Sequence, residues 1–299
     1  MGTTAVIETT KLTKRFGRQT AVDALTLMVP RGSVFAFLGR NGAGKTTTIR
    51  MLLHLLDKTA GTARVLGMDS VRDALAIKRR VGFVGDGQVL YDWMSVDELL
   101  WFCKGFYPGW DDAVAGEMKG KLELPGRAKV RGLSRGEQAK LALLLAMAYR
   151  PELLILDEPT AGLDVVVRRD FLEGVIELIQ EEGRTVFFSS HLVHEVERVA
   201  DWVGIIDRGR LICCRPLEEL KARVKRLTLT FDDPPADLRA RLPAVLAMEG
   251  GGRRVGMIVN DCSEATLAAA RALHPTALAV GDLSLEDIFV ALVGRAEEA

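Results

Sequence analysis

The stretch Gly39-Arg40-Asn41-Gly42-Ala43-Gly44-Lys45-Thr46 decides the fold of this chain. It follows the continuous apolar run Val34–Leu38, which is typical of a strand buried on both faces, and a helix is expected from about Lys45. Glycines at this spacing let backbone N–H groups converge on a phosphate, and the helix N-terminus adds partial positive charge. A glycine-rich turn that merely caps a helix is the alternative, which spacing and context disfavour. The sequence therefore predicts a strand, a phosphate-binding loop and a helix in succession.

The position of two side chains in the phosphate-binding loop predicts their roles. The Lys45 ammonium would contact the β- and γ-phosphates of a nucleotide, and the Thr46 hydroxyl would ligate Mg²⁺. Thr47 follows in the first turn of the expected helix and is included among the nucleotide-binding residues. These assignments predict ATP and Mg²⁺ as the bound cofactors.

Two further apolar strands end in polar residues. Residues 153–156 lead into Asp157 and Glu158, and residues 185–188 lead into Ser189-Ser190-His191. Ligands bind at the carboxyl ends of strands in open α/β sheets. Asp157 would hold the metal, and Glu158 would polarise the attacking water. Two exposed acids ahead of a proline turn are the alternative for this pair.

A helix start lies farther along the chain at Leu133-Ser134-Arg135-Gly136-Glu137. Ser134 and Glu137 have the spacing of a capping box, and an apolar run follows. A capped helix start with a glycine beside it is also an anion site, so Ser134 and the Gly136 amide could face a γ-phosphate from another subunit. Capping alone remains the simpler interpretation of this segment taken by itself.

The chain resembles the ATP-binding cassette family, whose motifs run in a fixed order. They are a Walker A loop, a Q-loop, a signature, Walker B, a D-loop and a switch histidine. The matching segments are residues 39–46, Asp86, residues 133–137, residues 153–158, residues 161–164 and His191. The resemblance covers about residues 5 to 220, and the ordered set is far more specific than any one motif.

The resemblance implies roles that the residues alone do not. Phe16 would stack on adenine, Asp164 would couple two ATP sites, and His191 would hold the γ-phosphate and water. Taken singly, Phe16 could be a packed turn aromatic, His191 a helix-start histidine, and residues 160–164 a loop with a helix cap. The family further implies a head-to-tail homodimer, or a pair with a homologous cassette, and a separate membrane permease.

Two positions depart from the family pattern. Arg135 places a guanidinium in the signature where the family often has glycine, and it would contact phosphate or point to solvent. The Gln expected after the strand Val81–Val84 falls at Asp86, with Gln88 two residues on. Asp86 could still meet Mg²⁺ or its water, but the coupling of this loop to a permease is then in question.

Aromatic residues cluster between residues 86 and 111, in Leu90-Tyr91-Asp92-Trp93-Met94 and Phe106-Tyr107-Pro108-Gly109-Trp110. The segment is similar to the Q-loop region of cassettes that serve bacterial ABC-2-type exporters. There it would form a groove for a helix of the permease. A hydrophobic core for the helical insert is the alternative. An aromatic cluster can form such a core and a binding surface at once.

The predicted fold class is α/β. We expect a P-loop NTPase core, with a RecA-like mixed sheet flanked by helices, and an antiparallel β subdomain at the start of the chain. A helical subdomain is expected at about residues 87–150, within a nucleotide-binding domain of residues 1–220. Residues 221–299 are predicted to form a small accessory α/β module, which could strengthen a dimer, regulate it or cover one end of the sheet.

The composition of the chain bears on whether it binds nucleic acid, spans a membrane or is secreted. Among 299 residues there are 40 basic and 40 acidic ones, so no net field favours nucleic acid, and no nucleic-acid partner is expected. Apolar stretches are far shorter than the roughly 20 residues of a membrane helix, and residues 1–10 lack a secretory signal. We therefore expect a cytoplasmic chain, held at the inner face of the membrane by its permease.

The leading hypothesis is the ATPase subunit of an exporter. A non-transport cassette acting mechanically on ribosomes, DNA or protein complexes is the second; such proteins commonly carry two fused cassettes or a long coiled-coil insertion, and neither is seen in this sequence. A small-molecule P-loop kinase would leave the signature, the D-loop and His191 unexplained.

Overall fold

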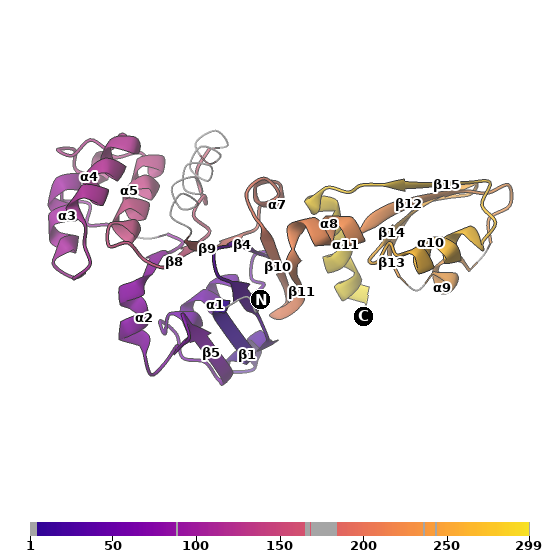
Figure 1. Cartoon of the computed structure of the whole chain (residues 1–299), viewed down its shortest axis with the longest axis horizontal. Coiled ribbons are helices and arrows are strands. Elements are labelled where there is room, and N and C mark those ends of the chain that lie inside the picture. The colour runs from indigo at the N-terminus through magenta and orange to yellow at the C-terminus, as the bar shows by residue number, and fades with distance from the viewer. Residues whose placement is uncertain are drawn as a thin grey trace. The chain divides into compact units, whose positions relative to one another are not determined.

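The computed structural model describes residues 5–87, 89–164, 168, 184–235, 237–242 and 244–298. The chain forms two compact units, which are described separately (Figure 1). The first unit comprises Met1–Leu192 and Trp202–Cys214, and the second comprises Val193–Asp201 and Arg215–Ala299.

A six-stranded sheet forms the centre of the first unit, in the order β11-β10-β4-β9-β8-β7. The five strands from β10 to β7 are parallel to one another. The bounds are β4 Val34–Leu38, β7 Val81–Val84, β8 Leu153–Asp157, β9 Thr185–Ser190, β10 Trp202–Asp207 and β11 Arg210–Pro216. Every residue of β4, β8 and β9 is buried, as continuous apolar runs in a parallel sheet should be. The predicted mixed core sheet is confirmed.

The phosphate loop lies between β4 and the helix α1, Lys45–Leu52, as predicted. Gly44 is the N-cap residue of α1 and has φ +109°, a conformation that side chains with a Cβ rarely adopt. The helix also buries Ile49 and Leu52 among residues of both sheets. The loop is thus anchored at both ends by core packing.

A second, antiparallel sheet packs in the same unit. Its strand order is β2-β1-β5-β6, and β3 pairs with β1. The bounds are β1 Ala5–Phe16, β2 Gln19–Leu25, β3 Met28–Pro30, β5 Ala60–Val65 and β6 Met68–Asp69. A turn at Gly17 joins β1 to β2, and the antiparallel β subdomain agrees with the prediction.

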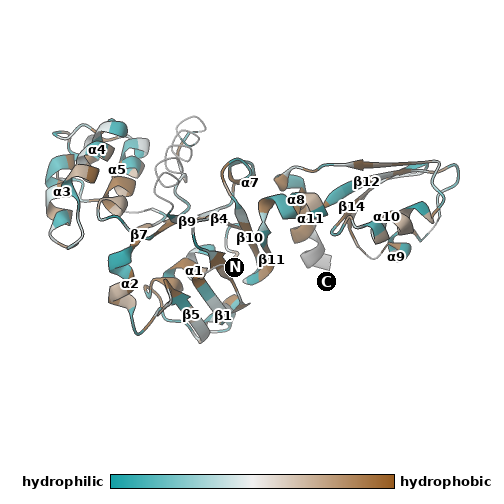
Figure 2. Ribbon diagram, in the orientation of Figure 1, coloured by the Kyte–Doolittle hydropathy of each residue, from teal (hydrophilic) through white to brown (hydrophobic). Residues whose placement is uncertain are grey.

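Helices occupy most of the stretch between β7 and β8. They are α3 Val96–Lys104, α4 Asp112–Lys121, the 3-10 helix η1 Val130–Gly132 and α5 Arg135–Met147, with α2 Ala74–Arg80 ahead of β7. Figure 2 shows the hydrophilic end of α2, which carries three consecutive basic residues. Pro108-Gly109 and Pro125-Gly126 both fall between helices, since proline and glycine disfavour a helix interior. Capping boxes start α3 and α5, at Ser95 with Glu98 and at Ser134 with Glu137.

The second unit has a four-stranded antiparallel sheet in the order β13-β14-β12-β15. The bounds are β12 Lys225–Thr230, β13 Val245–Gly251, β14 Arg254–Val259, β15 Ala277–Gly281, α7 Val193–Val196, α8 Leu217–Arg223, α9 Leu238–Arg241, α10 Glu264–Arg271 and α11 Leu285–Glu298. One core in this unit includes Leu227 and Leu229 of β12 and Met257 of β14. The sequence analysis predicted an α/β module here without placing its elements, and β13 and β15 show little strand pattern of their own. Both of those strands contain glycine or small residues, whose strand preference is low.

No helix in the described ranges is long and apolar enough to cross a bilayer.

Candidate functional site

Close packing explains why the phosphate loop needs its glycines. A Cβ on Gly39 would lie 2.5 Å from the carbonyl oxygen of Ile206, and one on Gly44 would lie 2.6 Å from that of Ala21. Both distances are too short for a real contact, so a side chain at either position would displace the loop. Arg40 and Asn41 are exposed at the tip, whereas Ala43 is buried.

Lys45 is buried and points its ammonium at three oxygen atoms. Its Nζ donates to the carbonyl oxygens of Gly39 at 2.7 Å and Arg40 at 3.3 Å. It also forms an ion pair with Glu158 Oε1 at 3.0 Å. The side chain is 5% exposed, so this ion pair is largely shielded from solvent. The loop and the end of β8 are thereby joined through one cation.

Asp157 and Thr46 present oxygen atoms to the same point. Asp157 Oδ1 accepts hydrogen bonds from Thr46 Oγ1 at 3.1 Å and from Ser189 Oγ at 2.7 Å. Burial raises the pKa of Asp157, the two hydrogen bonds oppose that rise, and the charges of Glu158 and Asp86 add to it. A carboxylate beside a hydroxyl suits Mg²⁺, which takes few protein ligands and completes its shell with water and phosphate. The residues present therefore fit the metal that the sequence predicts.

Glu158 lies between Lys45 and His191. Its Oε2 is 2.8 Å from His191 Nδ1, and its backbone N–H donates to Ser189 Oγ at 2.9 Å. Glu158 also has φ +49°, a left-handed conformation that costs energy in a residue with a Cβ and is common at functional sites.

Of two other predicted residues, Asp86 borders this centre, and Phe16 lies at the end of β1. Asp86 lines a cavity of about 250 Å³ together with Asn41, Thr47 and Glu158. Phe16 ends β1 with its side chain 49% exposed, and the Lys14 ammonium lies 4.9 Å from the ring centroid. One face of the Phe16 ring thus carries a cation, which a stacking base would have to displace or avoid.

The signature residues form a separate group with Asp164. Ser134, Arg135, Gly136 and Glu137 line a cavity of about 430 Å³ that Asp164 also borders. Glu137 Oε2 accepts from the backbone N–H and the hydroxyl of Ser134, both at 2.7 Å. These hydrogen bonds lower the pKa of Glu137. The capping box predicted from the sequence is therefore present.

Ser189 is the residue of this centre that the sequence analysis did not assign. It is fully buried and binds both Asp157 and the backbone of Glu158. It lies directly across from Asp157 in the parallel pairing of β8 with β9. A polar residue at the end of an apolar strand was the available signal, but only the strand register identifies its partner.

The aromatic segment divides between core and surface. Tyr107 stacks on Tyr149, with ring centroids 4.0 Å apart and planes at 8°, and Tyr149 donates to the carbonyl oxygen of Val81. By contrast, Tyr91, Trp93 and Phe106 are 50%, 60% and 65% exposed. The core interpretation holds for Tyr107, and the interpretation as a permease-docking groove stays a prediction for the exposed rings.

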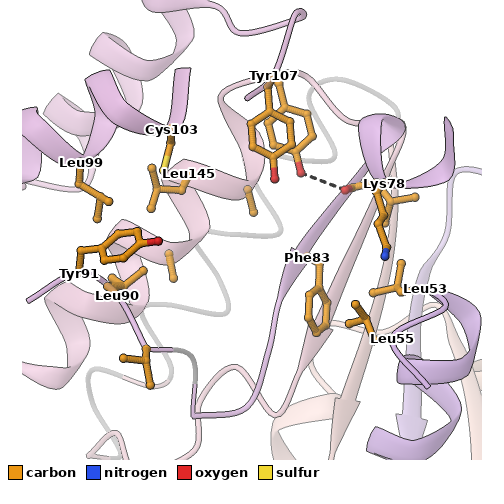
Figure 3. Close-up of a pocket in the computed structure, with 15 residues that line it drawn as sticks. Leu53, Leu55, Lys78, Phe83, Leu90, Tyr91, Leu99, Cys103, Tyr107 and Leu145 are labelled. Carbon is orange, nitrogen blue, oxygen red and sulfur yellow. Dashed lines mark hydrogen bonds between the residues drawn. The ribbon is translucent and has the colours of Figure 1, made fainter. Parts of the chain in front are cut away.

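A cavity of about 360 Å³ opens beside these aromatics (Figure 3). Figure 3 shows Leu90, Tyr91, Leu99 and Cys103 on one side of it and Phe83, Leu53, Leu55 and Lys78 on the other. Burial raises the pKa of the Cys103 thiol, so this cysteine stays protonated and apolar. The cavity wall is mainly hydrophobic, with one lysine.

A parallel sheet with a phosphate loop, a buried carboxylate and a second carboxylate held by lysine and histidine defines an ATP-binding P-loop ATPase. The family model described as "ABC transporter" matches residues 22–161. Bacitracin transport ATP-binding protein BcrA of Bacillus licheniformis is 37% identical over 74% of this chain and 73% of its own length. BcrA of Enterococcus faecalis is 31% identical over 97% and 96%. The chain belongs to the ABC transporter family, as an ATP-binding subunit with ATPase activity.

Solved structures agree on the fold. The structure of an ATP-binding subunit of an ABC transporter superposes with a TM-score of 0.65 at 24% identity and covers 73% of this chain and 92% of that one.

Proposed function

We propose that two copies of this chain, or this chain and a homologous cassette, bind ATP head to tail and drive export through a separate membrane permease. Each nucleotide would lie between the phosphate loop of one copy and Ser134, Arg135, Gly136 and Glu137 of the other. The observation that carries the proposal is the division of the predicted residues into two groups. Lys45, Asp157, Glu158 and His191 form one hydrogen-bonded network, and Ser134, Gly136 and Glu137 line a different cavity. Arg135 lines that second cavity and also one that it shares with Asp86 and Glu158.

In this proposal the phosphate loop and strand ends perform the chemistry. Bound Mg²⁺, held by Thr46 and Asp157 with Asp86 near its water shell, would neutralise charge on the phosphates. Lys45 would release Glu158 and bind the β- and γ-phosphates. Glu158, held in place by His191 and by its bond to Ser189, would then accept a proton from the attacking water.

Export and membrane association are proposed from the relatives and the aromatic cavity. Both BcrA proteins are named for bacitracin transport, and this cassette would serve a permease in a similar way. The exposed rings of Tyr91, Trp93 and Phe106, beside the hydrophobic cavity, offer apolar area for a helix of the permease. Docking there would hold the chain at the inner face of the membrane.

The dimer is tested by trapping it. The Glu158→Gln chain should bind ATP and accumulate dimers in sedimentation experiments, because hydrolysis no longer reopens the pair. Lys45→Ala in the same background should remain monomeric, since it binds nucleotide weakly. A Glu158→Gln chain that stays monomeric at saturating ATP contradicts the head-to-tail arrangement.

Permease docking is tested by changing exposed rings. Tyr91→Ala with Trp93→Ala should weaken co-purification with the membrane permease and leave the ATPase rate of the isolated chain unchanged. Met28→Ala removes another exposed apolar side chain, from β3, and serves as the matched control. Equal loss with both sets of substitutions would place the docking surface elsewhere.

A further inference from the structure

The segment that follows His191 in the chain belongs to the second unit. Leu192 alone separates His191 from Val193, where residues 193–201 of the second unit begin. This segment contains α7, which buries Val193 and Val196 and packs against α11 of the same unit. On its other side, His191 follows directly on β9 of the central sheet in the first unit. The backbone on either side of His191 is therefore held by a different unit.

Two helices of the second unit begin with hydrogen bonds to this segment. The Leu217 N–H, at the start of α8, donates to the carbonyl oxygen of Asp201 at 2.9 Å. The Leu285 N–H, at the start of α11, donates to Glu197 Oε2 at 3.1 Å. The first N–H groups of a helix have no partner within the helix, and a carboxylate beside them also interacts favourably with the helix dipole. The segment thus supplies an acceptor to each helix start.

Glu197 uses both of its carboxylate oxygens in this arrangement. Its Oε1 pairs with Lys221 Nζ of α8 at 2.8 Å, while its Oε2 binds the start of α11. The hydrogen bond with Glu197 raises the pKa of Lys221. The Glu197 and Lys221 side chains are 25% and 34% exposed, so solvent screens the ion pair only in part. One side chain therefore fixes the segment after His191 to two helices.

We propose that Glu197 is a positioning residue for His191: by fixing the segment to α8 and α11, it keeps the histidine against Glu158 during ATP hydrolysis. The inference rests on the role proposed above for His191. His191 Nδ1 lies 2.8 Å from Glu158 Oε2, and the His191 side chain is 37% exposed. Because packing surrounds this side chain only in part, its backbone on both sides must fix its place. The second unit thereby influences the rate of hydrolysis through the backbone that leads to His191.

The ATP turnover and ATP affinity of the full chain distinguish positioning from binding. Glu197→Ala removes the ion pair and the bond to α11, and it should lower kcat about tenfold, since a misplacement of about 1 Å can cost up to about a hundredfold. The ATP concentration for half-maximal rate should stay within about twofold, because Lys45 and Thr46 keep their contacts. Glu197→Gln keeps an oxygen that can accept from the Leu285 N–H but loses the ion pair, so its kcat should fall less.

A double-mutant cycle with His191 tests the route of the effect. His191→Ala should itself lower kcat, and adding Glu197→Ala should cause no further fall, because a positioning residue has no effect once the group that it positions is gone. Glu249→Ala is the matched control: it breaks the ion pair with Arg226 on the sheet of the same unit, and kcat should stay unchanged. Thermal unfolding of each variant measures any loss of stability separately from kcat.

The outcomes separate this inference from the proposed chemistry. Normal turnover by His191→Ala would contradict the role of His191 and overturn this inference with it. If His191→Ala is slow but Glu197→Ala turns over normally, or if the losses of the two variants multiply, only the role of Glu197 is overturned. An equal fall in Glu249→Ala would overturn it as well, since the effect would then be general to the second unit.

A further variant covers the case in which Glu197→Ala does not fold. Lys221→Met removes the cation, keeps a side chain of similar length and leaves Glu197 bonded to the Leu285 N–H. It should turn over ATP more slowly than the unaltered chain, with no further loss when added to His191→Ala. Normal turnover by Lys221→Met, or a loss that multiplies with that of His191→Ala, would overturn the role of Glu197.

Discussion

The phosphate-loop half and the signature half of the proposed ATP site are held in different ways. Lys45, Asp157 and Ser189 are buried, and their bonds join β4, α1, β8 and β9. Ser134 and Arg135 are exposed, and Ser134 bonds to Glu137 within one turn of α5. Long-range packing positions the first half, whereas local capping positions the second. A substitution in the first half should thus affect folding and chemistry together, but one in the second should affect mainly the chemistry.

The largest effect is expected at Glu158, where chemistry depends on the buried network. Glu158→Gln should lower ATP turnover about a thousandfold, as removal of a general base does, with ATP binding retained. Phosphate release measures ATP turnover, and a fluorescent nucleotide measures ATP binding. Glu152→Gln, at an exposed carboxylate paired with Arg80, is the control and should turn over normally. Normal turnover by Glu158→Gln would show that another group activates the water.

A comparison of Ser189→Ala with Ser134→Ala addresses stability directly. Ser189→Ala leaves the Glu158 N–H and one Asp157 bond unsatisfied in a buried place, which should cost about 2–3 kcal/mol. Ser134→Ala removes an exposed cap and should cost about 1 kcal/mol. Chemical denaturation of both variants measures the difference. Equal costs would mean that the two halves are anchored alike.

The same cap substitution in two helices separates capping from nucleotide binding. Ser95→Ala and Ser134→Ala remove equivalent hydrogen bonds at α3 and α5, so each should cost about 1 kcal/mol of stability. Only Ser134→Ala should also lower ATPase activity, because only Ser134 is proposed to face a phosphate. Steady-state hydrolysis at saturating ATP is the measurement. A comparable loss of activity in Ser95→Ala would reduce the role of Ser134 to capping.

The smallest effect concerns the pH dependence of the α3 box. Hydrogen bonds from the Ser95 backbone, from Lys129 and from the Ser95 hydroxyl lower the pKa of Glu98 from 4.5 to about 2. A lowered folded pKa gives stability that is present above pH 4.5 and lost as the pH falls towards 2. The difference in thermal midpoint between the unaltered chain and Glu98→Gln should therefore shrink over that window. A difference independent of pH would show that Glu98 acts only through its neutral hydrogen bonds.

Local patterns in the sequence were sufficient for a large part of the first unit. The apolar runs of β4, β8 and β9, the phosphate loop and the capped start of α5 match the structure. Each depends on residues close together in the chain, where periodicity, glycine spacing and caps act directly. The roles assigned to the site residues stay predictions until they are tested.

The second unit was less predictable for a physical reason. β15, Ala277–Gly281, has only small and aliphatic residues and lies at the sheet edge, and β13 ends in Glu249-Gly250-Gly251. Neither segment has a strong strand pattern of its own. Both are strands because β12 and β14 offer hydrogen-bonding edges, and pairing of this kind depends on context more than on propensity.

The sequence by itself determined that a phosphate loop follows one buried strand and that Asp157 and Glu158 lie at the end of another strand. Both features depend only on residues that are adjacent in the chain. Only the tertiary structure placed Ser189 opposite Asp157 and set Glu158 between Lys45 and His191. It also packed Tyr107 against Tyr149 and left Tyr91 exposed. These outcomes depend on strand register and on packing between segments as many as 113 residues apart, as in the ion pair of Lys45 with Glu158. Contacts of that range arise from the folded arrangement as a whole, which no local pattern encodes.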